Sequence, residues 1–447
     1  MSHQSEFQNK LITPEQAGNL VKSGDTVDLY GYNACGELMD RELARRVNEL
    51  RDVKVRCMQR VGVWKYLQAD SECRSFISTP IFVGPIERIM IKHENMNPHP
   101  ALFYEYPLMY RKGDLRVDVG SRMVSPMDEE GYFHFGNCPA YGKGLVDGSK
   151  VFVAEINTNM HPVASAHPDC KIHISEVDYI VEGENPAFGE LPDPIPTEID
   201  EKIAGYIYSA IGDGACLQIG YGNTPFAVTS LLAKSDLKDL GVHTEMLTDS
   251  IMKLYQAGLV TGKKKQIDKG QMTYCLGVGT RAFVDFIYTC TDAHSCPVDY
   301  TNDPHIIGLN DNVVSINGCL EMDITGQINS ETMGTRQISG TGGQLDFVLG
   351  AYRSKNGQSI IACPATYKKK DGTIGSRIVT TLNPGTGITD PRASAHKVVT
   401  EYGMVTLKGA TMWERAERII SIAHPDFREQ LFQEAEKLKL WRRSNKI

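Results

Sequence analysis

The sequence lacks the features that mark membrane, secreted or nucleic-acid-binding proteins. Its first ten residues are polar and contain no apolar signal core. No apolar run approaches the length of a membrane span. The formal net charge of −8 leaves no basic footprint for nucleic acid. We therefore expect a cytoplasmic protein with neither a nucleic-acid nor a membrane partner.

Metal-binding and disulfide patterns are also missing. The eleven cysteines are scattered, their number is odd, and none forms a Cys-x-x-Cys pair. His161, His167 and His173 are loosely spaced, with no cysteine or carboxylate cluster beside them, so hydrogen-bonded histidines are favoured over metal ligands. A Gly-x-Ser-x-Gly nucleophile motif is absent as well. The sequence thus predicts no metal site, no disulfide framework and no serine nucleophile of that type.

The chain instead has the composition and periodicity of a globular α/β protein. With 447 residues, 41% hydrophobic and 23% charged, it is long enough for two or three domains. The spacing of apolar residues predicts a strand at 26–30, a helix at 37–50 and a strand at 53–58. The second half of the chain alternates in the same way. This alternation indicates largely parallel sheets covered by helices.

Prolines and helix-start signals divide the chain. Thr13-Pro14 begins a helix that is expected to end at Gly24. Four prolines within 183–196 forbid a continuous helix or central strand, so we place a linker there. The predicted division is an N-terminal α/β domain over 1–185, a Pro-rich linker over 186–196, and a C-terminal α/β domain over 197–447. Further elements are predicted in the C-terminal domain: strands at 215–220, 272–277, 307–316 and 359–362, and helices at 226–233, 411–423 and 426–440.

A single carboxylate stands out near a predicted strand end. Glu245 follows Thr244 and precedes the apolar pair Met246 and Leu247. A carboxylate can act as the nucleophile of covalent acyl transfer, provided that backbone N–H groups hold the oxyanion. A surface or capping carboxylate is the alternative, and residue 245 taken alone favours that alternative.

Two Gly-rich loops could supply those N–H groups. The first, 220–225, follows a predicted strand and reads Gly-Tyr-Gly-Asn-Thr-Pro. It resembles a dinucleotide fingerprint whose third glycine is replaced by Pro225, with Glu245 about twenty residues on. Pro225 is better interpreted as the first residue of a helix capped by Asn223 or Thr224. Such a helix start suits an oxyanion or a phosphate equally.

The second loop, 340–343, reads Gly-Thr-Gly-Gly. Three glycines among four residues allow the backbone to approach a ligand closely. A tight surface turn explains the same residues equally well.

Taken together, these stretches resemble the acetyl-CoA hydrolase/transferase family of class I CoA-transferases, in particular its 4-hydroxybutyrate and butyrate CoA-transferases. The resemblance covers most of the chain and is most specific in the second half. It rests on the segments 220–225, 241–246, 315–318, 340–347, 399–403 and 423–428, and more loosely on 125–128 and 131–132.

The resemblance implies a fold, an activity and a mechanism. The fold would be two similar open α/β domains with largely parallel sheets and the active site at their interface. The activity would be transfer of CoA between a short-chain acyl-CoA, butyryl- or 4-hydroxybutyryl-like, and a carboxylate such as acetate. Catalysis would be ping-pong, through a glutamyl-CoA thioester on Glu245. No cofactor is implied because coenzyme A is a substrate, and a homodimer or higher homo-oligomer is expected.

The same resemblance implies roles for individual residues. Asn302 is similar to a family asparagine that orients the nucleophile. Five residues would line the pocket as oxyanion donors or CoA contacts: Gly220, Gly222, Asn223, Gly342 and Gly343. Met246 and Leu247 would desolvate Glu245 and favour its neutral form, whereas Thr244 or Asn302 would offset this.

The chain also departs from the family pattern, and other functions compete with the transferase. Met127 stands where the family usually has a second proline, and the polar Gly120-Ser121-Arg122 replaces a more apolar strand in the half that shapes the acyl pocket. The competing functions are acyl-CoA hydrolysis at the same site, a nucleotide-dependent oxidoreductase built on loop 220–225, and a non-catalytic metabolite-binding protein.

Overall fold

The structure is a computed structural model that describes residues 2–92, 95–191 and 193–443. It contains two compact units, each assembled from three segments. The first comprises Met1–Pro192, Thr273–Thr301 and Ile338–Gly342, and the second comprises Asp193–Met272, Asn302–Gln337 and Gly343–Ile447. The chain thus first changes unit inside the predicted linker. Two later segments, 273–301 and 338–342, belong to the first unit although they lie within the predicted domain over 197–447. The domain division stays a prediction.

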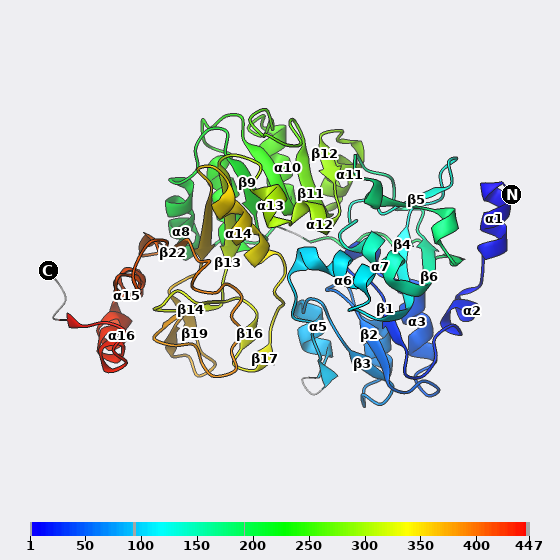
Figure 1. Ribbon diagram of the computed structural model, residues 1–447, viewed down its shortest axis with the longest axis horizontal. Helices are drawn as coiled ribbons and strands as arrows, with labels where there is room; N and C mark the ends of the chain where they lie inside the picture. Colours follow the sequence, from blue (N-terminus) through cyan, green and yellow to red (C-terminus); the bar gives the residue numbers. More distant parts are fainter. Residues whose placement is uncertain (1, 93–94, 192, 444–447) are drawn as a thin grey trace. The chain divides into compact units, whose positions relative to one another are not determined.

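The first unit is built on a six-stranded sheet with the order β3-β2-β1-β4-β6-β8. Every neighbouring pair in it is parallel, as the strand–helix alternation predicts. Helices α3 and α7 both pack against β4 (Figure 1). The bounds are β1 Thr26–Asp28, β2 Val53–Arg56, β3 Phe76–Ser78, β4 Val117–Val124, β6 Ser149–Ile156, β8 Tyr179–Glu182, α3 Glu37–Arg45 and α7 Gly142–Gly148.

Smaller elements complete this unit. They are α1 His3–Lys10, α2 Pro14–Gly18, α4 Lys65–Ala69, α5 Pro85–Met90, α6 Tyr106–Lys112, β5 Tyr132–His134, β7 Lys171–His173, α11 Arg281–Thr289, β12 Ala293–Ser295 and α12 Val298–Thr301, together with β11 Met272–Gly277 from its second residue onward. The returning segment 273–301 is tied in by polar contacts: the Asn137 amide donates to the Gly277 carbonyl at 3.1 Å, and the Ser165 hydroxyl donates to the Ser295 carbonyl at 2.7 Å.

Helix α2 starts as the sequence predicts and ends earlier. Thr13 and Gln16 form the expected capping box. The helix stops at Gly18, however, instead of Gly24. Arg46 explains the difference, because its guanidinium donates to the carbonyls of Gly18 and Val21, the latter at 2.8 Å. The side chain at the C-cap of α3 thereby binds the Gly18 carbonyl, which would accept an intrahelical N–H in a longer helix.

The polar strand that departs from the family pattern buries its arginine. Arg122 of β4 is fully buried, and its guanidinium carbon lies 4.0 Å from the ring centroids of both Tyr30 and Phe135. The same group donates to the carbonyls of Met123 at 3.2 Å and Cys138 at 3.1 Å. Cation–π contacts and carbonyl acceptors thus replace the apolar packing expected of such a strand.

The second unit contains the strand run β10-β9-β13-β18-β22-β23. The strands are parallel except for the antiparallel edge pair β22 and β23. Their bounds are β9 Cys216–Ile219, β10 Gly241–Leu247, β13 Val313–Gly318, β18 Gln358–Ala362, β22 Lys397–Thr400 and β23 Gly403–Thr406. Short strands form small sheets beside this run: β14 Glu321–Asp323, β15 Ile328–Asn329, β16 Thr332–Met333, β17 Arg336–Gln337, β19 Thr366–Lys368, β20 Ile374–Ser376 and β21 Ile378–Val379.

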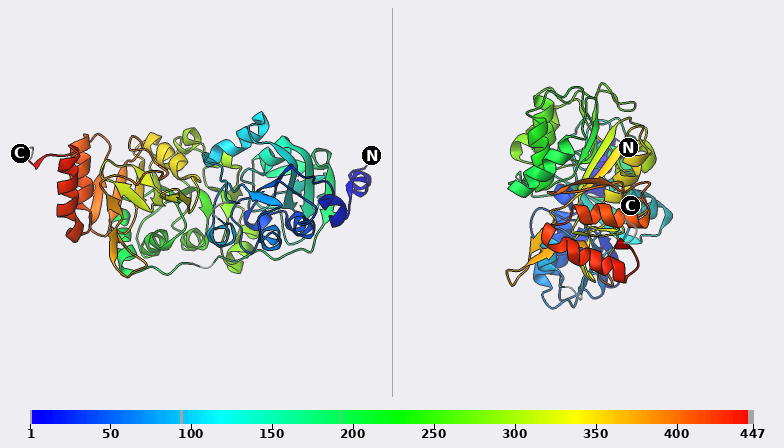
Figure 2. Two further views of the ribbon diagram at one scale, coloured as in Figure 1. Left: turned by 90° about the horizontal axis from the view of Figure 1, so that it is seen from below. Right: turned by 90° about the vertical axis from the view of Figure 1, so that its left-hand side faces the viewer.

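Helices flank this run of strands. Helix α14 packs against β13 and β18, α9 contacts β13, and α8 contacts β22. Figure 2 shows α15 and α16, drawn in red, lying side by side. The bounds are α8 Glu198–Tyr208, α9 Asn223–Leu232, α10 Asp249–Gln256, α13 Pro304–Ile307, α14 Gln344–Arg353, α15 Met412–Ser421 and α16 Pro425–Lys437.

The α/β class and the two large, mostly parallel sheets predicted from the sequence are confirmed. One predicted strand is too long. Residues 307–316 were expected to be extended, whereas β13 begins only at Val313. The preceding Pro304–Ile307 is helical, because Asp303 accepts the N–H of His305 at 2.7 Å and Pro304 occupies the first turn.

Candidate active site

Glu245 lies in the carboxyl-terminal half of β10 and is only partly buried. Its neighbours Thr244 and Leu247 are fully buried, so the strand itself is fixed in the unit's interior. The Thr244 hydroxyl donates to the Met246 carbonyl at 3.2 Å. This local bond stabilises the end of the strand. The Thr244 hydroxyl therefore binds the backbone, whereas one alternative in the sequence analysis had it support the Glu245 carboxylate.

The carboxylate is held by the side-chain amide of Asn302. Asn302 Nδ2 donates to Glu245 Oε2 at 2.7 Å, and Asn302 is fully buried. Asn302 stands between α12 and α13, where the chain turns at Asp303. A hydrogen bond to a charged group at this distance is among the stronger ones in proteins. The structure therefore brings together the two residues that the resemblance linked.

Gly343 supplies a second donor and the space for this arrangement. Its backbone N–H donates to the Glu245 carboxylate. A Cβ at residue 343 would overlap with both Glu245 Oε2 and Asn302 Nδ2 and would lie 3.2 Å from Glu245 Cδ. Gly343 is the N-cap of α14, at a backbone φ of −97° that any residue can adopt. Its lack of a side chain is thus what the contact with Glu245 requires.

Burial raises the pKa of Glu245 to about 7, while the hydrogen bonds from the Asn302 amide and the Gly343 N–H act in the opposite direction. Burial disfavours the charged form, and donors to a carboxylate favour it. A carboxyl group poised near neutrality can ionise at physiological pH and retains high basicity as a nucleophile. Strongly shifted carboxyl groups of this kind are candidates for chemistry.

The raised pKa predicts the pH dependence of any reaction in which the Glu245 carboxylate attacks. Because only the ionised form is nucleophilic, kcat/KM is expected to fall about tenfold for each pH unit below about 7. An ordinary glutamate would show that decline only below about pH 4.3. A kcat/KM–pH profile in constant ionic strength measures this limb, and a flat profile down to pH 5 would contradict it.

Asp346 is a fourth member of the site that the sequence analysis did not assign. It lies in the first turn of α14, is fully buried, and its Oδ2 is 3.4 Å from Asn302 Nδ2. One amide nitrogen thus faces two carboxylates. The available signal was an acidic residue directly before the apolar Phe347 and Val348, three residues after Gly343.

The first Gly-rich loop follows β9, the strand beside β10. In their parallel register Gly241 pairs with Cys216 and Val242 with Leu217. Continuing that register places Glu245 level with Gly220. The N–H of Gly220 donates to the Ile316 carbonyl at 3.1 Å and extends the hydrogen bonding between β9 and β13. The predicted role of Gly220 as an oxyanion donor or CoA contact stays a prediction.

Gly222 and Asn223 lie at the start of helix α9, and their predicted roles as oxyanion donors or CoA contacts stay predictions. Helix α9 begins at Asn223, with Gly222 as its N-cap at a φ of +148°, a backbone conformation that favours glycine. Neither Asn223 nor Thr224 caps the helix. Both side chains bind Asp200, and the Thr224 hydroxyl donates to it at 2.6 Å. Pro225 is consequently the third helical residue, where its missing N–H costs nothing.

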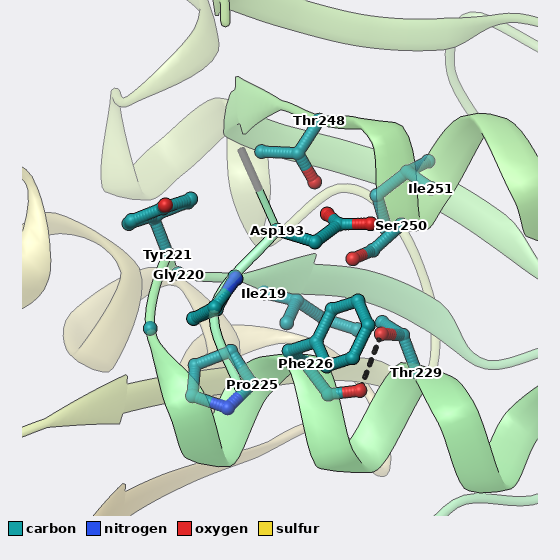
Figure 3. Close-up of a pocket in the computed structure, with 12 residues that line it drawn as sticks. Asp193, Ile219, Gly220, Tyr221, Pro225, Phe226, Thr229, Thr248, Ser250 and Ile251 are labelled. Carbon is teal, nitrogen blue, oxygen red and sulfur yellow. Dashed lines mark hydrogen bonds between the residues drawn. The ribbon is translucent and has the colours of Figure 1, made fainter. Parts of the chain in front are cut away.

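A shallow pocket opens over this loop (Figure 3). Figure 3 shows the side chains of Asp193, Ser250 and Phe226 in the pocket, with Tyr221 to one side and Pro225 on the helix below. The lining also includes Gly220, Gly222 and Thr248. Glu245 is not among the lining residues, although Thr248 follows β10 directly. The pocket therefore occupies the carboxyl-end edge of the sheet, where α/β proteins bind ligands.

Gly342, the remaining predicted residue, belongs to the first unit. Its carbonyl accepts the N–H of Phe103 at 3.2 Å, and its φ of +56° favours glycine. A Cβ there would lie 3.3 Å from the Phe82 ring. Its predicted role as an oxyanion or CoA contact stays a prediction.

The described residues lack two further features. No described cluster of three or more histidine, cysteine, aspartate or glutamate side chains is arranged to hold a metal ion. Within the described ranges, no helix is long and apolar enough to cross a bilayer.

A carboxylate with a raised pKa at a parallel-sheet edge, held by an amide and a backbone N–H, is an arrangement that suits covalent acyl transfer. The models of the acetyl-CoA hydrolase/transferase N-terminal and C-terminal domains match residues 1–188 and 279–435. The chain belongs to the acetyl-CoA hydrolase/transferase family, and the resemblance stated from the sequence is confirmed.

Individual relatives match over nearly the whole chain. The butyryl-CoA:acetate CoA-transferase of Anaerostipes caccae is 42% identical, with 100% of both chains covered. The 4-hydroxybutyrate coenzyme A transferase of Clostridium kluyveri is 37% identical and covers 98% of this chain and 100% of its own. The crystal structure of RipA from Yersinia pestis superimposes with a TM-score of 0.88 at 36% identity, covering 98% of this chain and 100% of its own. The chain is an enzyme of the CoA-transferase class.

Proposed function

We propose that this enzyme moves CoA between a short-chain acyl-CoA, butyryl- or 4-hydroxybutyryl-like, and a carboxylate such as acetate, through a thioester on Glu245. The observation that carries the proposal is the Glu245 carboxylate with a pKa of about 7, held by Asn302 and Gly343. The relatives described above, whose names include butyryl-CoA, acetate and 4-hydroxybutyrate, support this substrate class.

The first half-reaction begins with the ionised carboxylate. A Glu245 oxygen attacks the thioester carbonyl, the C–S bond breaks, and CoA leaves as the thiolate, giving an acyl-glutamyl anhydride. The thiolate then attacks the glutamyl carbonyl of this anhydride. The acyl group departs as a free carboxylate and Glu245 becomes a glutamyl-CoA thioester. An incoming carboxylate reverses these steps, so charge and atoms balance without a cofactor.

Asn302 and Gly343 act most directly in the second step. When the thiolate attacks the glutamyl carbonyl, negative charge develops on the Glu245 oxygen that is not bonded to the acyl group. Asn302 Nδ2, 2.7 Å from Oε2 in the resting structure, and the Gly343 N–H are already directed at this carboxylate. Donors positioned in advance lower the barrier because they need no reorganisation. The two groups that donate to Glu245 in the resting enzyme thus form the oxyanion hole of this step.

The pocket over loop 220–225 is the proposed contact region for CoA. It is lined by backbone at Gly220 and Gly222 and by the rings of Tyr221 and Phe226. Lys253, which pairs with Asp193, lies 5.8 Å from the Phe226 ring centroid. The pocket's small and aromatic lining groups suit contact with the pantetheine arm of CoA.

Intact-mass measurement tests the mechanism. After incubation with butyryl-CoA and removal of free ligand, the enzyme should gain the mass of CoA less one water on one residue, and peptide mapping should place the adduct on Glu245. Addition of acetate should discharge the adduct and produce acetyl-CoA. A catalytically active enzyme that never carries CoA would overturn the proposal.

Hydrolysis is the second candidate because the family also includes acetyl-CoA hydrolases by its name. The two activities differ in what consumes the thioester. For a transferase, we expect acetate to increase the loss of butyryl-CoA by at least about a hundredfold, with one acetyl-CoA formed per butyryl-CoA lost. Free thiol, measured continuously with a thiol reagent, should stay near background. Thiol release that is independent of acetate would instead assign a hydrolase.

The family assignment leaves no support for a dinucleotide oxidoreductase, whose fingerprint was already interrupted at Pro225. The expected homo-oligomeric state and cytoplasmic location stay predictions.

A further inference from the structure

We propose that Asp346 is a positioning residue that keeps the Asn302 amide nitrogen turned toward Glu245, an inference that rests on the proposed role of Glu245 as nucleophile. The three side chains come from different elements: Glu245 from β10, Asn302 from the turn between α12 and α13, and Asp346 from α14. The Asn302 amide nitrogen Nδ2 faces both carboxylates: it lies 2.7 Å from Glu245 Oε2 and 3.4 Å from Asp346 Oδ2.

An asparagine side chain has two ends of similar shape and opposite polarity. Its nitrogen carries two hydrogens, whereas its oxygen only accepts. Rotation by about 180° about the last side-chain bond would present the oxygen to the Glu245 carboxylate, and two acceptors would then face each other. In the observed orientation each of the two amide hydrogens can face one carboxylate. In the inverted orientation the amide oxygen would face both carboxylates, so Asp346 adds a second unfavourable contact.

Burial of this contact makes the wrong orientation of the Asn302 amide costly in free energy. Asn302 and Asp346 are both fully buried, so water cannot replace a lost partner. Leaving a buried polar group unpaired costs about 1–3 kcal/mol, and more for a charged group. Asp346 also occupies the first turn of α14, where the positive end of a helix favours a carboxylate. The fold therefore places a stable acceptor where it can direct the amide.

Three possible roles for Asp346 predict three different effects of Asp346→Asn on the kcat/KM–pH profile. If Asp346 directs Asn302, Asp346→Asn lets the Asn302 amide invert, Glu245 loses its donor, and the acid limb of kcat/KM moves to higher pH. If Asp346 acts only as a nearby negative charge, its removal moves the limb to lower pH. If it is merely structural, the limb stays in place. A titratable side chain near this region is His243, which lies two residues before Glu245 on β10, is fully buried, and has its ring centroid 6.4 Å from that of Phe347.

The test is a double-mutant cycle on the full-length enzyme, with Asn302→Ala and Asp346→Asn made singly and together. Loss of one oxyanion donor costs about 10²- to 10³-fold in kcat, so Asn302→Ala is expected to fall in that range. Asp346→Asn alone should lower kcat/KM about tenfold and shift the acid limb upward. In the Asn302→Ala background the same change should cost less than about twofold, because the side chain it positions is gone.

Asp323→Asn is the matched control. Asp323 is a buried aspartate on β14 of the same unit, and it accepts hydrogen bonds from Thr325 and Gln327. Asp323→Asn should lower Tm and leave the acid limb of kcat/KM unchanged. Equal losses from Asp346→Asn in both backgrounds, or an unshifted limb, would overturn the positioning role. The wild-type CoA adduct on Glu245 is measured in the same series, so failure of the mechanism itself would be seen separately.

Discussion

Replacing Glu245 with glutamine is expected to lower kcat by about 10⁴-fold or more and to abolish the CoA adduct. Glutamine has nearly the same size but no anionic oxygen, so no anhydride or thioester can form on it. Removal of a covalent nucleophile typically costs losses of this order. The substituted amide also presents hydrogens or an oxygen to Asn302, whose nitrogen lies 2.7 Å from Oε2 in the wild type.

The measurement combines single-turnover kinetics with intact mass after exposure to butyryl-CoA. Glu201→Gln provides the control, because Glu201 is exposed on α8 and the same chemical change there should leave both readouts at wild-type values. KM for acyl-CoA should change little, since the proposed CoA contacts lie in the pocket over loop 220–225. A Glu245→Gln enzyme with more than a few per cent of wild-type turnover would require another nucleophile.

The sequence predicted the parts of this protein that depend on local pattern. Strand β10 with Glu245, strand β9 and the capping box of α2 follow from residue spacing and cap chemistry. Tertiary partners decided where that reasoning failed. Arg46 ends α2 early, and Asp200 recruits the side chains of Asn223 and Thr224, which then cannot cap α9. Neither interaction leaves a trace in the sequence of the helix it affects.

The site shows the same division. Asn302 lies 57 residues from Glu245, and only the resemblance to a known family linked them before the structure placed their atoms in contact. Asp346 was missed because an acidic residue in a helix's first turn is ordinary on grounds of capping alone. Its contact with Asn302 depends on how α14 packs against α13, the helix that begins two residues after Asn302, and periodicity does not specify this packing.

Gly343→Ala is expected to lower kcat/KM by about 10²- to 10³-fold while the protein still folds. The added methyl would overlap with Glu245 Oε2 and Asn302 Nδ2, so at least one of the two must move and the hydrogen bond between them is lost. The Gly343 N–H would be displaced from the carboxylate at the same time. Two donors are then misplaced together, each typically supporting catalysis by about two orders of magnitude, with overlapping effects.

Gly205→Ala separates this steric effect from the general cost of replacing glycine. Gly205 lies inside α8, and a Cβ there would meet nothing within 4 Å. That change should leave activity unaltered and stabilise the fold by about 0.5–1 kcal/mol, because alanine favours helix. Thermal unfolding and kcat/KM, measured on both variants, give the comparison.

The backbone at residue 343 makes the interpretation of Gly343→Ala direct. Its φ of −97° is open to alanine, so a loss of activity cannot be attributed to backbone strain. If Gly343→Ala kept wild-type kcat/KM, the carboxylate would have to work equally well after displacement from Asn302. The proposal that this amide and this N–H form the oxyanion hole would then fail, even if the CoA adduct on Glu245 were observed. A slow enzyme that still accumulates the adduct would instead show that the chemistry survives and that only its stabilisation is lost.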